Sequence, residues 1–202
     1  LFLDTADTEL IEKYYKTNLI DGVTTNPTLI MKSGRNPEDV YQELIDMGLD
    51  DVSMEVVGDF DAMYIEGLRL FRKFGKCATI KVPCTPDGLR ACRELARDLV
   101  NVNVTLIFSP AQAILAAKAG AKYVSPFVGR VDDNSFDGID LVDQISDIYT
   151  IQNIRKTEIL AASVRDVKTV SDAFGAGAHV VTMPPSIPVS YTHLRAHETT
   201  TN

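Results

Sequence analysis

The sequence contains few of the features that define disulfide-stapled, zinc-binding or membrane-spanning proteins. Its three cysteines, Cys77, Cys84 and Cys92, include no CxxC pair, so neither a disulfide framework nor a zinc site is predicted. Such thiols are typical of a reducing compartment, and we expect a cytoplasmic protein. No apolar run approaches the about 18 residues of a membrane helix, and no charged leader precedes an apolar core. We therefore expect neither a membrane partner nor a signal peptide.

Basic residues are outnumbered by acidic ones. The 202-residue chain has 20 lysines and arginines against 28 aspartates and glutamates, which gives a formal net charge of -8. This balance argues against nucleic acid and against anionic membrane surfaces as partners, although a locally basic site can still bind a small anion. The hydrophobic content of 45% and the length allow a buried core without staples.

Short segments rich in β-branched residues alternate with longer segments of helical periodicity. The predicted strands are Leu1–Leu3, Gly22–Thr24, Val52–Val57, Ala78–Val82, Val102–Ile107, Tyr123–Ser125, Glu158–Ala161 and His179–Thr182. The predicted helices are Thr8–Thr17, Pro37–Met47, Asp61–Phe74, Pro86–Leu99, Pro110–Ala119, Gly138–Ile151 and Val167–Gly175. Three of these helices end beside a glycine that suits a left-handed cap, namely Gly48, Gly75 and Gly120.

Strands that alternate with helices predict a parallel sheet that is covered on both faces. The number of strands fits a closed (β/α)8 TIM barrel. An open doubly wound sheet is the rival fold, but its glycine fingerprint is absent from the loop Asp4–Asp7 after the first strand. We predict one barrel domain over residues 1–183, followed by an irregular tail over residues 184–202.

Residues 184–202 do not continue the alternation. They include His193, His197 and a run of threonines, and no eighth helix with an apolar face can be drawn through them. We interpret the chain from about residue 189 as non-native sequence, with a genuine polar tail as the alternative. The C-terminal helices of the barrel are therefore expected to be missing or replaced, and no chemistry is assigned to the two histidines.

Lys81 is the most informative charged residue, because it lies in the otherwise apolar segment Ala78–Pro83. Barrel active sites lie at the C-terminal ends of the strands, and lysine is almost never fully buried without a partner or a function. Burial disfavours the ammonium form and so favours the neutral amine that attacks carbonyl groups. The alternatives are a lysine that reaches solvent and a structural ion pair with Glu55.

Other polar residues fall where a barrel would point them inward. Ser53 and Glu55 share one strand face, as do Asn103 and Thr105, because side chains alternate along a strand. Barrel interiors are normally filled by branched apolar residues, so repeated inward polar groups predict a site. A buried polar network without chemistry is the alternative.

Charged residues in the loops after the strands give weaker signals. Asp4 follows the first strand and could equally cap the next helix. Arg130 and Arg165 follow neighbouring strands, and two converging arginines would make a clamp for phosphate or carboxylate. The acidic stretch 132–137 lacks calcium-loop spacing and is expected to be a solvated loop. Because His179 is the only histidine before the tail, a metal-dependent enzyme is disfavoured.

Six segments of the chain together resemble the transaldolase/fructose-6-phosphate aldolase family. They read LFLDTA, GVTTNPT, IKVP, NVTLIFS, AGAKYVSPFVGR and AASVR, and they occur in order up to about residue 183. The resemblance implies a (β/α)8 barrel that needs no metal and no other cofactor and that acts on sugar phosphates. It also implies a homo-oligomer, an expectation that the altered C-terminal segment weakens.

The resemblance implies a role for each matching residue. Lys81 would be the Schiff-base nucleophile, Asp4 would be the general acid/base, and Glu55 and Thr105 would hold a catalytic water. The substrate-binding residues would be Asn26, Asn103 and Ser163 for hydroxyl groups, Arg130 and Arg165 for the phosphate, and Thr24, Ser53, Ser125 and Phe127 as supporting residues. The implied activity is a transaldolase of the pentose phosphate pathway, which moves a dihydroxyacetone unit from fructose 6-phosphate or sedoheptulose 7-phosphate to an aldose phosphate.

Two positions distinguish the branches of the family. The fructose-6-phosphate aldolases typically have glutamine in place of Glu55 and tyrosine in place of Phe127, whereas this chain has the transaldolase pair. An aldolase that releases free dihydroxyacetone is the alternative within the family. A non-catalytic truncated barrel is the alternative outside it.

Overall fold

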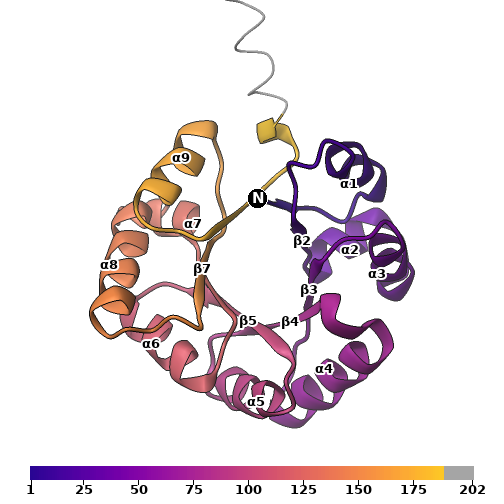
Figure 1. The fold of residues 1–202 in the computed structure, drawn as a ribbon, viewed down its shortest axis with the longest axis horizontal. Coiled ribbons are helices and arrows are strands. Elements are labelled where there is room, and N and C mark those ends of the chain that lie inside the picture. Colours follow the sequence, from indigo (N-terminus) through magenta and orange to yellow (C-terminus); the bar gives the residue numbers. More distant parts are fainter. Residues whose placement is uncertain (189–202) are drawn as a thin grey trace, which may run out of the picture.

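The computed structural model describes residues 1–188, which fold into a closed barrel of parallel strands (Figure 1). The strands are β1 (Phe2–Asp4), β2 (Gly22–Thr24), β3 (Asp51–Glu55), β4 (Ala78–Pro83), β5 (Asn101–Ile107), β6 (Tyr123–Pro126), β7 (Glu158–Ala161) and β8 (Val180–Met183). Each strand pairs with its neighbours in sequence, and β1 pairs with β8 to close the ring. The predicted (β/α)8 barrel is confirmed, and the open sheet is excluded.

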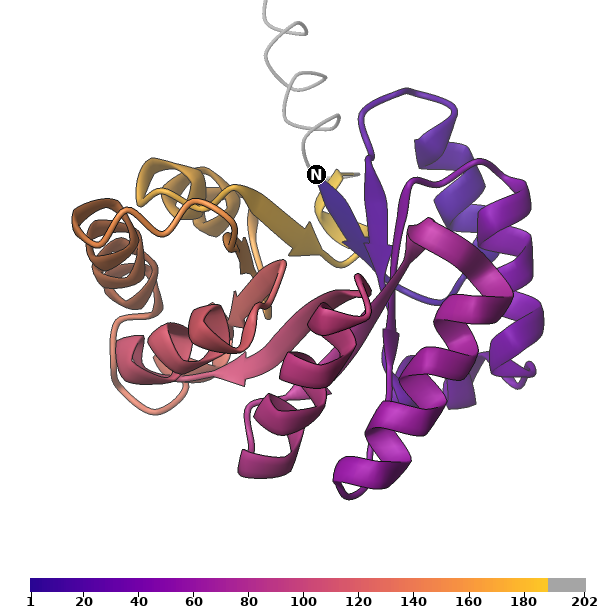
Figure 2. The same cartoon turned by 60° about the horizontal axis from the view of Figure 1, so that its bottom comes forward.

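Most helices form an outer ring around the strands (Figure 2). They are α1 (Thr8–Tyr15), α3 (Pro37–Asp46), α4 (Phe60–Phe74), α5 (Pro86–Arg97), α6 (Pro110–Ala119), α8 (Gly138–Ile151) and α9 (Val167–Gly175), with the 3-10 helix η1 (Gly75–Cys77) after α4. Each long helix matches a predicted one to within a few residues. The left-handed cap expected at Gly75 is wrong, because its φ of 75° is combined with a ψ of -153° that leads into η1. Within residues 1–188, no helix is long and apolar enough to cross a membrane.

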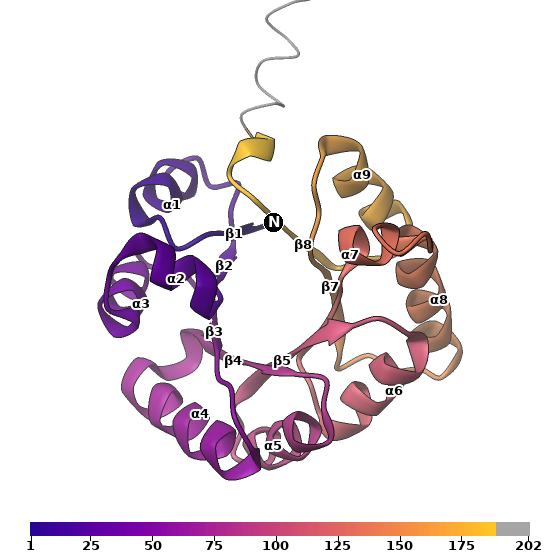
Figure 3. The same ribbon diagram turned by 180° about the vertical axis from the view of Figure 1, so that it is seen from behind.

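Two short helices, α2 (Pro27–Ser33) and α7 (Val128–Asp132), were not expected from the sequence. Both lie at the same end of the barrel, which faces the viewer in Figure 3. Asn26 caps α2, and Gly34 ends it in the left-handed conformation. In contrast, α7 has no side-chain cap, so its local sequence does not specify it.

The acidic stretch after Arg130 is exposed at every residue from 132 to 137, and residues 133–137 form the expected solvated loop. Asp132 is the last residue of α7, and its Oδ1 accepts a hydrogen bond from the backbone N–H of Gly138 at 2.8 Å. Asp137 caps α8 by accepting hydrogen bonds from two backbone N–H groups. Carboxylates near helix N-termini are stabilising, so these acids fix the entry into α8.

The main hydrophobic core lies between the barrel and the helices, and a second, smaller cluster fills part of the barrel interior. The small cluster consists of Phe2, Tyr123 and Leu160, and the rings of Phe2 and Tyr123 meet edge-on with centroids 6.0 Å apart. Gly22 makes room for the Phe2 ring, because a Cβ at this position would lie 2.7 Å from the ring carbons. We call these three residues the floor cluster, since they lie below the polar part of the interior.

Above the floor cluster the barrel interior is polar. This part is formed by buried residues of six strands, namely Thr24, Ser53, Thr79, Lys81, Asn103, Thr105, Ser125 and Thr182. Ser53, Asn103 and Thr105 are each at most 1% exposed, and they face the interior, because Asn103 and Thr105 line the inner cavity and Asn103 donates a hydrogen bond to Ser53. Polar groups replace the branched apolar side chains that normally fill a barrel, so this end of the barrel is built around a site.

Strand β5 contains an irregularity close to the same end. Leu106 has a φ of 61°, and the register with β6 shifts between Val104 and Ile107. A bulge of this kind bends a strand and redirects its side chains. Non-glycine residues in the left-handed region are strained, and such strain is concentrated at functional sites.

The last described residues follow β8 directly. A helical turn includes residues 186–188, Ile187 is 3% exposed, and the Tyr14 hydroxyl donates a 3.4 Å hydrogen bond to the backbone oxygen of Pro185. This segment therefore packs against the barrel, although it lies beyond the domain boundary predicted at Met183, the last residue of β8. Residues 189–202, with His193 and His197, lie outside the described residues, so their interpretation as non-native sequence stays a prediction.

Candidate active site

Lys81 is buried near the C-terminal end of β4, with 6% of its surface exposed. Its Nζ donates a 2.9 Å hydrogen bond to the backbone oxygen of Thr25 and lies 3.0 Å from Oε2 of Glu55. A lysine that simply reaches solvent is therefore excluded. The ion pair with Glu55 is formed, and both partners line a cavity rather than a closed core.

Asp4 lies at the end of β1, on the inner face of the barrel. Its Oδ1 accepts a 2.8 Å hydrogen bond from the Thr24 hydroxyl, which in turn lies 2.6 Å from the hydroxyl of Thr182. The capping role that the sequence left open for Asp4 is wrong, because Asp7 caps α1 by accepting from the backbone N–H of Leu10. The Asp4 carboxylate is thus held by a threonine pair and points toward the cavity.

Asn103 joins two serines across the barrel interior. Its Oδ1 accepts a 2.8 Å hydrogen bond from the Ser125 hydroxyl, and its Nδ2 donates to the Ser53 hydroxyl at 3.4 Å. These contacts connect β3, β5 and β6. The carboxamide is therefore fixed in orientation before any ligand binds, as a pre-organised binding group requires.

Thr105 has a buried hydroxyl whose hydrogen-bonding capacity is unused. The residue is 1% exposed, and its Oγ1 has no hydrogen-bond partner within residues 1–188. Buried hydroxyls in folded proteins are nearly always paired. An unpaired hydroxyl in a cavity wall, one strand away from Lys81, marks a position that suits a water molecule or a substrate oxygen.

Two connected cavities open at this end of the barrel. The inner cavity, of about 170 Å³, is lined by Asp4, Thr24, Asn26, Lys81, Asn103, Thr105, Ser125, Phe127, Arg130, Leu160, Ala162, Ser163 and Thr182. The mouth cavity, of about 490 Å³, shares six of these residues and adds Glu55, Leu106 and the first turn of α2. Of the predicted site residues, Ser53 and Arg165 line neither cavity.

The predicted arginine clamp is partly assembled. Arg130 lines both cavities, and its guanidinium lies 5.1 Å from the centroid of the Phe127 ring. Arg165 instead donates hydrogen bonds from both terminal nitrogens to the two carboxylate oxygens of Asp133. This bidentate pair lowers the pKa of Asp133 and raises the pKa of Arg165.

Gly129 allows the loop after β7 to approach α7 closely. A Cβ at this position would lie 2.3 Å from the backbone oxygen of Ser163 and 2.9 Å from Nε of Arg165. The backbone N–H of Gly129 also donates a 3.1 Å hydrogen bond to that Ser163 oxygen, and Ser163 itself has a φ of 59°. The glycine thus brings Ser163 to the inner cavity and Arg165 close to the start of α7.

Sequence reasoning missed Thr182, which contacts Thr24 and lines the inner cavity. The signal was available, because Thr182 is a polar residue at the end of a predicted strand. Asn26 has a second role that was not foreseen, since its Oδ1 accepts from the backbone N–H of Leu29 and so caps α2. Among the described residues, no group of histidine, cysteine, aspartate or glutamate could hold a metal ion.

The fold and the position of these residues define a (β/α)8 barrel with a polar site at the C-terminal ends of its strands, the usual location of barrel active sites. The chain matches the sequence pattern of the transaldolase/fructose-6-phosphate aldolase family over residues 1–201, and it belongs to this family. The resemblance carried by the six segments is thereby confirmed. The chain is an enzyme of the aldolase or transaldolase type.

Curated relatives support the same assignment. A probable transaldolase from Nitrosopumilus maritimus is 52% identical over 188 residues, which cover 93% of this chain and 84% of the relative. A probable transaldolase from Caulobacter vibrioides is 50% identical over 188 residues, which cover 93% of this chain and 86% of the relative. Both matches extend over nearly the whole barrel.

Solved structures show the fold alone. Residues of this chain superpose on a mutant flavocytochrome b2 with a TM-score of 0.67 and 14% identity, covering 92% of this chain and 56% of the other. A second mutant, with benzoylformate, gives a TM-score of 0.60 and 16% identity over 81% and 48% of the two chains. This chain therefore spans about half the length of those proteins, and the likeness concerns the barrel.

Proposed function

We propose that this protein is a transaldolase, which transfers a dihydroxyacetone unit from a ketose phosphate to an aldose phosphate through a lysine Schiff base. One observation carries the proposal: Lys81 is 6% exposed, borders an open cavity and lies 3.0 Å from the Glu55 carboxylate. A buried amine with an adjacent proton acceptor is the arrangement that amine nucleophiles require. Family membership supports the same chemistry.

The first step forms the covalent intermediate. A proton moves from the Lys81 ammonium to the Glu55 carboxylate, and the neutral Nζ adds to the C2 carbonyl of the ketose. The resulting carbinolamine loses its hydroxyl group as water, with a proton supplied by Glu55, and a protonated imine forms. Thr105 holds this water through its unpaired hydroxyl.

The second step breaks the C3–C4 bond. Asp4 removes the proton of the C4 hydroxyl, the bonding electrons move into the imine, and the aldose phosphate leaves. The remaining three-carbon enamine stays attached to Lys81 and attacks the aldehyde of an acceptor, with the proton returned by Asp4. A covalent carrier of this kind predicts ping-pong kinetics.

The remaining residues position the substrate. Asn26, Asn103 and Ser163 bind hydroxyl groups of the three-carbon unit, and Arg130 binds the phosphate at the mouth of the barrel. Arg165 joins it when the phosphate competes with Asp133, because a phosphate dianion is a stronger partner for guanidinium than one carboxylate. Four further residues support these contacts. Three of them line the inner cavity, namely Thr24, Ser125 and Phe127, and Ser53 lies behind the cavity wall.

Borohydride trapping tests the nucleophile. The protein is incubated with fructose 6-phosphate and reduced, and the adduct is mapped by mass spectrometry. We expect the substrate-derived mass on Lys81, and we expect it to be absent from Lys81→Met. Lys122→Met is the matched control, because Lys122 forms an ion pair with Asp51 at the opposite end of β3. A folded protein without an adduct would instead be the non-catalytic barrel.

Transaldolase and aldolase differ in what happens to the enamine. Phe127 borders the inner cavity and has no hydroxyl group to protonate the enamine, so we propose that the enamine survives until an acceptor arrives. The test is an assay without acceptor aldehyde. Release of free dihydroxyacetone in every turnover would favour the aldolase. A single burst of aldose phosphate, with the three-carbon unit retained on the enzyme, would favour the transaldolase. Phe127→Tyr is expected to increase the release.

The biological setting remains part of the proposal. The substrates point to the pentose phosphate pathway and therefore to the cytoplasm. A homo-oligomer is proposed on the family resemblance alone. Size-exclusion chromatography with light scattering measures the assembly directly.

A further inference from the structure

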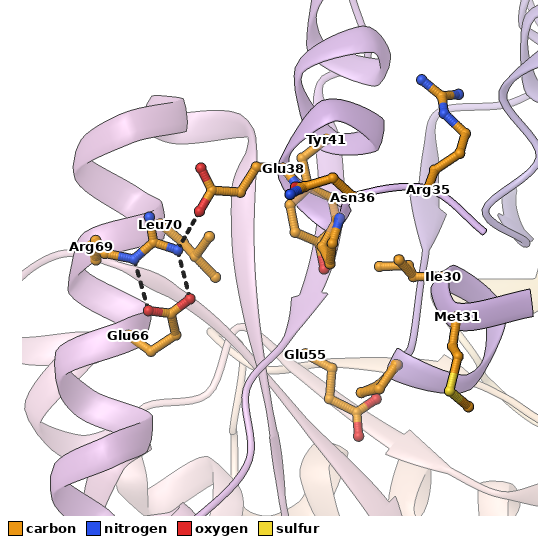
Figure 4. Close-up of a pocket in the computed structure, with 12 residues that line it drawn as sticks. Ile30, Met31, Arg35, Asn36, Glu38, Tyr41, Glu55, Glu66, Arg69 and Leu70 are labelled. Carbon is orange, nitrogen blue, oxygen red and sulfur yellow. Dashed lines mark hydrogen bonds and ion pairs between the residues drawn. The ribbon is translucent and has the colours of Figure 1, made fainter. Parts of the chain in front are cut away.

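A third cavity, of about 500 Å³, lies beside the active site between α2, α3 and α4, and we call it the side pocket (Figure 4). Its wall includes Ile30 of α2, Tyr41 of α3 and Leu70 of α4. Figure 4 shows Glu55 at its inner end, with Ile30 and Tyr41 above the carboxylate. Glu55 also lines the mouth cavity together with Lys81, so this one carboxylate borders both spaces.

The outer edge of the side pocket is lined by ion pairs, two of which link α3 and α4. Arg69 of α4 donates two 2.7 Å hydrogen bonds to Glu66 on its own helix, and its NH2 nitrogen lies 2.6 Å from Glu38 of α3. Glu38 also pairs with Lys73. These contacts connect α3 and α4 across the outer edge of the pocket.

The inner part of the side pocket offers polar groups to water. Tyr41 is 4% exposed, and its hydroxyl lies close to Thr25, whose backbone oxygen accepts the hydrogen bond from Lys81. Burial raises the pKa of Tyr41, and the nearby Glu55 charge adds to this effect, so the hydroxyl keeps its proton. A polar site needs two to four such partners to hold a water, which occupies about 30 Å³. The pocket has room for several.

The proposed Schiff-base reaction creates a need for this space. Each imine that forms releases one water at Lys81, and each imine that is hydrolysed consumes one. At both moments the proposed sugar adduct occupies the inner cavity, which measures about 170 Å³ and is lined in part by Lys81. Water that leaves through the mouth would have to pass the covalently bound substrate.

We infer that the side pocket is the water path of the reaction, through which the water made and used at Lys81 reaches bulk solvent by way of Glu55. This inference rests on the proposed Schiff-base function. The carbinolamine C–O bond breaks, Glu55 supplies the proton, and the neutral water passes behind Glu55 into the pocket. Hydrolysis reverses these events: a water enters, gives a proton to Glu55 and adds to the imine carbon.

Narrowing the pocket tests the inference. Ile30→Phe narrows its inner end, and Met31→Trp covers it from α2, where Met31 is 75% exposed and tolerates a large side chain. Ile30→Ala widens the same position. Leu115→Phe, on the exposed surface of α6, is the control for adding an aromatic ring elsewhere.

The measurement uses fructose 6-phosphate labelled with oxygen-18 at C2, without acceptor. The rate of label loss without enzyme is first subtracted from the rate with enzyme. The corrected rate is then divided by the rate of imine formation, which borohydride quenching measures independently. In the wild type, Ile30→Ala and Leu115→Phe, the released water escapes, so each imine cycle loses the label. In Ile30→Phe and Met31→Trp the water is retained and added back, so most of the label loss disappears.

The outcomes separate the inference from the function on which it rests. Absence of an imine in the wild type would contradict the Schiff-base proposal itself. Normal imine formation with wild-type label loss in both narrowed variants would overturn the water path. If Ile30→Phe fails to fold in a thermal melt, Met31→Trp decides alone, because its side chain starts at an exposed position.

Discussion

Glu55 and Lys81 are paired residues of the neighbouring parallel strands β3 and β4, and their charged groups lie 3.0 Å apart on the inner face of the barrel. The register of the two strands alone sets this contact. A shift of one residue would turn one of the two side chains outward, since side chains alternate along a strand. The chemistry at this end of the barrel is therefore fixed by backbone pairing and not by a mobile loop.

Replacing Glu55 by glutamine should slow the chemistry and leave the fold intact. We expect Glu55→Gln to form the imine about 100-fold more slowly, because the amide cannot exchange a proton with Lys81. The free energy of unfolding should fall by about 1–3 kcal/mol, because the buried Lys81 ammonium loses its counter-charge although the amide oxygen can still accept a hydrogen bond from Nζ. Rapid quenching with borohydride measures the rate. An unchanged rate would remove Glu55 from the mechanism.

The ion pair at the opposite end of the barrel should serve stability alone. Asp51 is 5% exposed, and its Oδ2 lies 2.7 Å from Nζ of Lys122 and accepts a 3.0 Å hydrogen bond from the Tyr123 hydroxyl. Lys122→Met leaves this buried carboxylate without its cation. Because Lys122 is itself partly exposed, we expect a loss of about 1–3 kcal/mol, below the full value for a buried pair. Denaturant unfolding measures the loss, and kcat of the folded enzyme should not change.

Gly129 should be intolerant of any side chain. Gly129→Ala places a Cβ 2.3 Å from a backbone oxygen, so the loop after β7 has to move. We expect a loss of about 1–3 kcal/mol in stability, together with a higher KM for phosphorylated substrates because Arg165 moves with the loop. Gly175→Ala is the matched control, since nothing lies within 4 Å of its added Cβ. Equal behaviour of the two variants would contradict the prediction.

The ion pairs around Glu38 should give the protein a stability that depends on pH. Lys73, followed by Arg69, lowers the pKa of Glu38 below its ordinary value. The folded state therefore binds this proton less readily than the unfolded state. The resulting stabilisation is fully present above the unfolded pKa of about 4.3 and is lost as the pH falls through the lower folded value.

Thermal melts of the wild type and of Glu38→Gln test this expectation. The wild type should have the higher Tm at neutral pH, and the difference should disappear at low pH and shrink in high salt, because the pairs are exposed. A difference that persists after Glu38 is protonated would show that another interaction is responsible.

Hydrophobic periodicity predicted the barrel and its outer helices, because these elements are long enough for tertiary packing to follow the local pattern. The short helices α2 and α7 were not predicted from the sequence, for different reasons. The start of α2 at Asn26 and its end at Gly34 carry recognisable signals, but no helix was predicted between the strand Gly22–Thr24 and the helix Pro37–Met47. No local signal specifies α7, whose stability comes from its contact with the loop that contains Ser163.

The candidate site was predictable where strand alternation applies and not where the backbone departs from it. Lys81, Ser53 and Asn103 follow from period two and their place in a strand. The bulge at Leu106 and the left-handed backbone conformation of Ser163 could not be predicted in this way, since neither residue type prefers a positive φ. The bidentate pair of Arg165 with Asp133 joins two loops that are distant in sequence, and only the assembled structure brings them together.

The floor cluster sets a limit on what the site can accept. Leu160 belongs to this apolar cluster and also lines the inner cavity, so the cluster is the bottom against which a bound molecule comes to rest. The Phe2 and Tyr123 rings pack against each other in the same cluster, and Arg130 lines both the inner cavity and the mouth cavity. The barrel is thus closed by apolar side chains at this end, and a longer bound molecule extends toward the mouth of the barrel.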